Sequence, residues 1–219
     1  MLNYNAHKRM NRSLLKADNN DQLFKYFWYQ CGISPRIIND LVKSGVLWQS
    51  DEGLAVFPIF DSVCADKIVG AEFIDCNQST CVTPFTQQVR GMSDYSNGFE
   101  FPLSTDHDVT IILESVMELL YFYAMYKPLL RKMNCLLVST SGNYADLVSY
   151  YAFAYHPSTL IYASLRNPEN PTNSIVNMDD EEWQATWWEP MRGYNSWEAQ
   201  YKQLNKTHFQ VCDPSSVPF

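Results

Sequence analysis

The stretch Val109-Thr-Ile-Ile-Leu113 decides the fold, because a short uncharged run of β-branched and aliphatic residues predicts a buried strand. Two similar runs follow it, Cys135-Leu-Leu-Val-Ser139 and Thr159-Leu-Ile-Tyr-Ala163. Between these runs the apolar residues have helical spacing, which predicts one helix that stops near Pro128 and another over residues 144–155. Strands that alternate with helices indicate a parallel sheet with helices on both faces.

Polar residues follow each of these three predicted strands. Glu114 comes after the first strand, residues 140–143 after the second and residues 164–167 after the third. The carboxyl ends of parallel strands meet at one edge of a sheet, where functional groups gather. We therefore expect a site at this edge, and the candidates are Glu114, Ser141, Gly142, Asn143 and Arg166.

The chain before residue 100 has a different pattern. Apolar residues at helical spacing between residues 21 and 48 predict two short helices, the second opened by Ser34-Pro35 and followed by Gly45 in a left-handed cap. The runs 54–60 and 68–74 predict two strands joined as a hairpin.

A domain boundary is expected near residue 100. Residues 75–105 are rich in Ser, Thr, Asn, Gly and Pro without sustained periodicity, so we expect connecting loops there. The sequence thus predicts a small α+β domain over residues 1–100 and an α/β domain over residues 101–219.

The tail combines acids with tryptophan. The acidic run at 179–182 is expected to open a helix, where it would complement the helix dipole. Tryptophans at 183, 187, 188 and 197 are typical either of packing against the sheet or of a surface that contacts a partner or stacks on bases.

The charge is unevenly distributed. The net charge is −8, but residues 1–50 carry +4, from seven Lys or Arg against three acids, which leaves −12 on residues 51–219. Two interpretations stay open for the basic start of the chain: contact with phosphate, or a solvated terminus. Its candidate anion-binding residues are Lys8, Arg9, Arg12 and Lys16.

Composition excludes several classes. No apolar run reaches the roughly 18 residues that a membrane helix needs, and residues 1–16 lack the apolar core of a secretion signal, so we expect a cytoplasmic protein with no membrane partner. Six cysteines without a CxxC pair and four dispersed histidines argue against a structural zinc site and for reduced thiols.

Several short motifs occur in an order that resembles a known family. Gly32-Ile-Ser, Ala55-Val-Phe and Gly70-Ala-Glu resemble the small domain that precedes the toprim domain in primase-like proteins of plasmids and other mobile elements. The likeness covers most of the chain and continues through Gly91-Met-Ser and Gly98-Phe. It then reaches Ile111-Ile-Leu-Glu114-Ser and Leu136-Leu-Val-Ser-Thr-Ser-Gly142, which resemble the first two strand ends of toprim.

The resemblance implies roles for particular residues. In toprim enzymes a glutamate after the first strand acts as general acid or base, and Asp-x-Asp after the third strand binds a divalent cation. Glu114 matches the glutamate, either as a relic or as a cap of the next helix. Residues 163–169 contain no aspartate but do contain Arg166, which would repel a cation and suits a phosphate or carboxylate instead.

A later motif is also altered. Trp197 matches the tryptophan of the Asp-Trp-Asn motif that often closes the family's domain, but its flanking residues differ. Glu169 and Glu198 stay open as substitute metal ligands.

The expected function is therefore binding, without a cofactor. We expect a catalytically degenerate toprim-like or primase-like protein of a plasmid, phage or integrated element that binds nucleic acid or a nucleic-acid-processing protein. One alternative is a magnesium-dependent nuclease or nucleotidyl transferase with relocated ligands. Another is an acidic inhibitor or adaptor that mimics nucleic acid.

Overall fold

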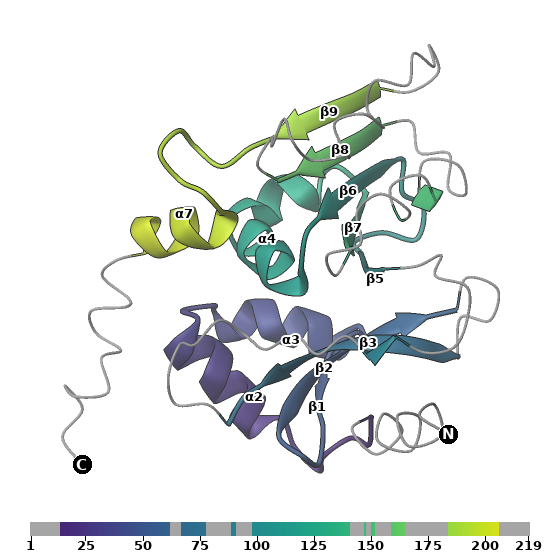
Figure 1. The fold of residues 1–219 in the computed structure, drawn as a ribbon, viewed down its shortest axis with the longest axis vertical. Helices are drawn as coiled ribbons and strands as arrows, with labels where there is room; N and C mark the ends of the chain where they lie inside the picture. Colours follow the sequence, from purple (N-terminus) through teal and green to yellow (C-terminus); the bar gives the residue numbers. More distant parts are fainter. Residues whose placement is uncertain are drawn as a thin grey trace. The chain divides into compact units, whose positions relative to one another are not determined.

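Two compact units make up the chain, Met1–Ser93 together with Leu204–Phe219, and Asp94–Gln203. The computed structural model describes residues 14–61, 67–77, 89–90, 98–140, 147, 150–151, 159–164 and 184–205. Both units mix helices with strands, around an antiparallel sheet in the first and a mixed sheet in the second (Figure 1). This confirms the mixed α/β class that the sequence predicts.

The first unit is built on a four-stranded sheet in the order β1-β2-β3-β4. These strands are Trp48–Gln49, Leu54–Phe60, Ile68–Asp75 and Val89–Arg90, and each pairs antiparallel with its neighbour. The predicted hairpin of β2 and β3 is confirmed. Strand β4 was not predicted, because it has only two residues and lies in the segment expected to form loops.

Helices accompany this sheet in the predicted order. Helix α2 (Asp21–Lys25) continues into the π-helical segment η1 (Tyr26–Gln30), and α3 spans Pro35–Lys43. The Ser34 hydroxyl accepts a backbone N–H of the first turn of α3, and Gly45 has a φ of 78°, so both predicted caps of this helix are confirmed.

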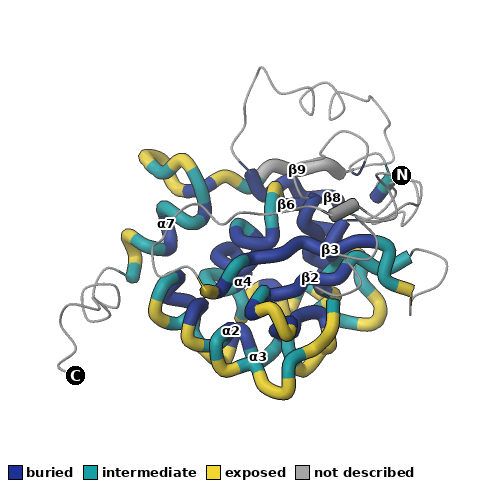
Figure 2. Tube along the Cα trace, turned by 60° about the horizontal axis from the view of Figure 1, so that its bottom comes forward, coloured by how far each residue is buried: buried dark blue, intermediate teal, exposed yellow. Residues whose placement is uncertain are grey.

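Apolar side chains cover both faces of the β2–β3 hairpin. Trp48, Val56, Ala71 and Phe73 form a buried cluster on one face. Phe57 points to the opposite face, because side chains alternate along a strand, and contacts Phe27 of η1 edge-to-face at 6.3 Å. Figure 2 shows β2 and β3 as largely buried segments.

The second unit contains a five-stranded sheet in the order β5-β7-β6-β8-β9. Its strands are Phe99–Pro102, Val109–Leu113, Cys135–Ser139, Thr159–Ala163 and Gln184–Trp188, numbered β5 to β9 along the chain. The three strands predicted at 109–113, 135–139 and 159–163 are confirmed. The predicted parallel pairing of these strands is confirmed and extends to β9, but β5 pairs antiparallel with β7, so the sheet is mixed rather than parallel throughout.

The residue just before strand β5, Gly98, lies very close to strand β7. A Cβ atom on Gly98 would lie 2.1 Å from the carbonyl oxygen of Ser139 in β7. Only glycine fits at this point without moving the backbone.

Helical residues cover both faces of this sheet. Helix α4 (Val116–Leu130) lies on one face, where Tyr123 contacts Phe101 of β5 edge-to-face at 5.1 Å. Leu147 and Tyr151 pack on the other face, in a cluster with residues of β6, β7 and β8. The rest of the helix predicted over residues 144–155 lies outside the described residues.

Helix α4 ends near Pro128, as predicted. It continues past Pro128 to Leu130, since a proline in the last turn removes one hydrogen bond without preventing two more helical residues. Helix α4 has 15 residues, and none of the helices in the described part of the chain is both long and apolar enough to cross a bilayer.

The residues just after the acidic run form a strand, whereas the sequence predicts a helix there. Residues 179–182 lie outside the described segments, and the residues just after them, Gln184–Trp188, form strand β9 rather than a helix. The threonine and two tryptophans of this stretch favour a strand, and pairing with β8 supplies the hydrogen bonds.

Tyr151 connects the helical layer to the edge strand β5. Its hydroxyl accepts the N–H of Gly98 at 3.1 Å and donates to Glu100 at 2.7 Å, and its side chain is fully buried. Tyr151→Phe is expected to lower the free energy of unfolding by about 1–2 kcal/mol, because it removes both of these hydrogen bonds. Urea denaturation measures this change, and Tyr194→Phe, at a partly exposed tyrosine, serves as the control.

Candidate functional site

A pocket of about 100 Å³ lies at the carboxyl ends of β6 and β8 in the second unit. Its walls come from the β6–α4 junction, the end of β8, the segment after β9 and the start of helix α7 (Trp197–Leu204). The lining residues are Glu114, Glu118, Ala163, Ser164, Pro190, Asn195, Ser196 and Trp197.

The order of the strands explains why the pocket forms at this place. The next strand along the chain after β6 is β7, on one side of β6, whereas the next strand after β8 is β9, on the opposite side. Connections that leave two adjacent parallel strands in opposite directions create a crevice at their carboxyl ends, where α/β proteins bind ligands. Glu114 and Ser164 follow β6 and β8 and line the pocket.

Glu118 connects helix α4 to helix α7. Its backbone N–H is capped by the Ser115 hydroxyl at 3.3 Å, and its carboxylate accepts the N–H of Trp197 at 2.8 Å. Burial raises the pKa of Glu118 to about 7, although backbone N–H groups of Trp197 and Glu198 lower it in part. The charges of Glu198 and Glu114 raise this pKa further.

Trp197 forms the buried wall of the pocket. Its indole N–H donates to the carbonyl oxygen of Ala163 at the end of β8, at 2.7 Å. Its ring contacts Phe122 and Tyr126 of α4, with centroids 4.9 Å and 5.8 Å apart. Trp188 of β9, which is partly buried, also contacts Phe122, so both tryptophans pack against α4.

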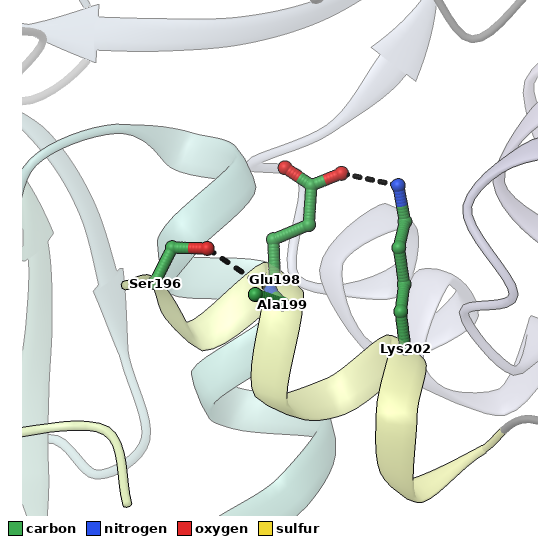
Figure 3. A network of polar contacts seen from close by, with 4 residues as sticks. All are labelled: Ser196, Glu198, Ala199 and Lys202. Carbon is green, nitrogen blue, oxygen red and sulfur yellow. Dashed lines mark hydrogen bonds and ion pairs between the residues drawn. The ribbon is translucent and has the colours of Figure 1, made fainter. Parts of the chain in front are cut away.

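Two polar contacts hold the start of helix α7 (Figure 3). The Ser196 hydroxyl accepts the N–H of Ala199 at 3.0 Å, which caps the helix. Glu198 forms an ion pair with Lys202, one turn later. Glu198, one of the two possible substitute metal ligands, is therefore paired with a cation of its own helix.

Glu114 lies at the mouth of the pocket. It is an exposed residue, and partial burial of its carboxyl group raises the pKa of that group. No hydrogen bond or ion pair joins this carboxyl to another described residue. The cap of α4 is Ser115, so the role of helix cap that the sequence left open for Glu114 belongs to its neighbour.

These carboxylates do not suit a divalent cation. Within the described segments, no group of three His, Cys, Asp or Glu residues is placed to hold a metal ion. Glu118 is hydrogen-bonded to the backbone of α7 and Glu198 is paired with Lys202, which leaves Glu114 alone, whereas magnesium requires several oxygen ligands in octahedral geometry.

Lys16, a predicted anion-binding residue, lies in the first unit. The Lys16 ammonium group lies 4.6 Å from the centroid of the Trp48 ring, a cation–π contact, and Lys16 is exposed. The other candidates lie outside the described residues: Lys8, Arg9, Arg12, Ser141, Gly142, Asn143 and Arg166, together with Glu169.

Glu118 was missed in the sequence, although two signals pointed to it. Ser115-Val-Met-Glu118 has the Ser-x-x-Glu spacing of a capping box. Glu118 also follows Glu114 by four residues, a spacing that brings side chains together on a helix. Neither signal reveals that its carboxylate bonds to Trp197, which is 79 residues away in the chain.

The chain matches no model of a known protein family and no curated protein.

Proposed function

We propose that this chain is a toprim-like protein that has lost metal-dependent catalysis and acts by binding a nucleic-acid-processing protein. Glu114 supports the resemblance, because it follows β6, the first parallel strand along the chain, as the glutamate follows the first strand in toprim. The observation that carries the proposal is the use of the neighbouring carboxylates. Glu118 and Glu198 hold helix α7, so the pocket offers Glu114 as its one uncommitted acid within the described residues.

The charge around the pocket favours a protein partner over nucleic acid. Three carboxylates interact here, those of Glu114, Glu118 and Glu198, and Lys202 is paired with Glu198. A negative surface repels phosphate and attracts basic side chains. The net charge of −12 on residues 51–219 extends this preference.

The cellular setting follows from the resemblance and from the thiols. Proteins of this kind belong to plasmids, phages and integrated elements and work in the cytoplasm. Cys31, Cys76 and Cys135 are buried and free, and burial raises the pKa of Cys76 to about 12 and that of Cys135 to about 11. Unreactive free thiols are compatible with a reducing compartment.

Affinity capture tests this function. We expect the tagged full chain, incubated with a lysate of the organism that carries it, to retain a protein that acts on nucleic acid. Retention should survive nuclease digestion and fall steeply between 0.1 and 1 M salt, because rim charges are screened over about 10 Å and 3 Å respectively.

Two results would contradict the proposal. One is recovery of DNA or RNA with loss of all retained protein after nuclease digestion, which would make nucleic acid the direct ligand. The other is retention that does not depend on salt, which would assign binding to an apolar surface instead.

A further inference from the structure

The size of the strand-end pocket limits its ligand. Pockets for cofactors and drug-sized ligands span roughly 300–1,000 Å³, whereas this pocket has about 100 Å³. Since a water molecule occupies about 30 Å³ in the liquid, the pocket has room for a few waters or for the head group of one side chain. The pocket is therefore too small to enclose a nucleotide.

The pocket contains polar groups that lack partners. Ser164 is only 8% exposed and lines the pocket, yet its hydroxyl has no hydrogen bond to any described residue. The Glu114 carboxyl and the Asn195 amide line the same pocket, and neither side chain is hydrogen-bonded within the described part of the chain. Glu114 and Asn195 are exposed, and solvent reaches the Ser164 hydroxyl through the pocket, so all three groups can accept hydrogen bonds from a ligand that donates them.

The electrostatics select a cation. Partial burial of its carboxyl group raises the pKa of Glu114, and a cation beside this group would offset the cost of that burial. Glu118 lies on the next helical turn and adds a second carboxylate, while Lys202 is committed to Glu198. Both carboxyl groups therefore favour a positive ligand.

The aromatic wall favours a planar cation. Trp197 lines the pocket beside the two carboxyl groups, and it is held by its indole N–H, which donates to Ala163, and by its backbone N–H, which donates to Glu118. A guanidinium group is planar, carries five N–H donors, stacks on aromatic faces and pairs with carboxylates in two-point contacts. An ammonium group is more strongly hydrated and has three donors.

We propose that this pocket binds the guanidinium group of an arginine side chain presented by a protein partner. Glu114 pairs with the guanidinium, Ser164 and Asn195 accept its remaining N–H groups, and the indole of Trp197 forms the adjoining wall. This assignment rests on the proposed function for the identity of the partner, but the pocket itself can be tested without any partner.

Methylguanidinium chloride is the probe for a test by NMR. The indole N–H signal of Trp197, assigned by its loss in Trp197→Phe, should shift in a saturable manner on titration of the full-length chain. Methylammonium chloride at equal ionic strength should bind at least about tenfold more weakly, since it makes fewer charge-assisted hydrogen bonds. Equal shifts with both salts, or saturable shifts with magnesium chloride alone, would overturn the assignment.

A pair of charge-neutralising variants separates the pocket from general charge. Glu114→Gln should weaken methylguanidinium binding by about tenfold or more. Asp106→Asn removes an exposed carboxylate before the opposite end of the same strand, and binding should remain as in the parent chain. Spectra of both variants report whether the fold is kept, and equal weakening by both would refute a specific role for Glu114.

The same variants distinguish this inference from the proposed function. If Glu114→Gln abolishes methylguanidinium binding but the captured protein is still retained, the partner docks elsewhere and the pocket assignment to that partner is wrong. If methylguanidinium binds as expected but no nucleic-acid-processing protein is retained, the pocket chemistry stands and the proposed function fails.

Discussion

Replacing Trp197 by alanine is expected to lower the free energy of unfolding by about 3–5 kcal/mol, as large-to-small changes at buried aromatic residues do. Trp197 is 2% exposed and contacts Phe122 and Tyr126 of α4. Its indole also donates to Ala163. The substitution therefore opens a cavity and leaves a strand-end carbonyl without a partner. Urea denaturation followed by circular dichroism measures the loss.

Two further variants separate packing from hydrogen bonding. Trp197→Phe keeps an aromatic ring against α4 but removes the bond to Ala163, so we expect a smaller loss of about 1–3 kcal/mol, which includes the smaller ring. Met191→Ala, at a side chain 55% exposed, should change stability by less than about 0.5 kcal/mol. If Trp197→Ala lowers the free energy of unfolding by no more than Met191→Ala does, Trp197 does not anchor helix α7 as the structure describes.

The parallel core of the second unit was predictable because its signals are local. The runs that form β6, β7 and β8 are buried and consist of uncharged residues, so each one predicts a strand without knowledge of the others. Alternation with helices then predicts parallel pairing. The position of Glu114 at the functional edge follows directly from that pairing.

Strands β5 and β9 were not predictable in the same way. Strand β5 (Phe99–Pro102) has four residues inside a segment of loop-forming composition, and β9 (Gln184–Trp188) follows an acidic run that favours a helix start. Both are edge strands of the sheet. Their structure depends on pairing with β7 and β8, which are distant in sequence, and tertiary pairing overrides local preference.

The second carboxylate of the pocket illustrates the same limit. Ser115-x-x-Glu118 predicts a helix cap in which the glutamate side chain bonds back to its own helix. In the structure that carboxylate instead accepts the N–H of Trp197 in α7. Helix α7 supplies the hydrogen-bond partner, so Glu118 connects two helices instead of capping one. The residues around Glu118 do not predict this contact, because α7 is distant in the sequence.

We expect the free energy of unfolding to depend on pH because of Glu118. Its pKa is 4.5 in the absence of the fold and about 7 in the folded chain, mainly because of burial. The fold thus favours the protonated acid, so the stabilisation is complete below pH 4.5 and is lost as the pH rises through 7. Since each pKa unit corresponds to about 1.4 kcal/mol, this loss is on the order of 3 kcal/mol.

Glu118→Gln tests this dependence, because an amide oxygen can still accept the N–H of Trp197 but carries no charge. The variant should be more stable than the parent chain by about 3 kcal/mol at pH 8 and nearly equal to it at pH 4.5. Unfolding at a series of pH values measures the difference between the two chains, in which the contributions of other titrating groups largely cancel.

Other charged groups near Glu118 also affect its pKa. Glu114 and Glu198 raise its pKa and backbone N–H groups of α7 lower it, while Lys202 is paired with Glu198. Asp106→Asn serves as the control. It removes an exposed carboxylate just before the start of β6 and should change stability by less than about 0.5 kcal/mol at either pH.

A Glu118→Gln variant that is less stable at pH 8 than the parent would contradict this prediction. It would show that the charged carboxylate stabilises the start of α7 by more than the cost of its burial. The pocket would then hold a well-solvated anion, and the case for a cationic ligand would lose its electrostatic basis.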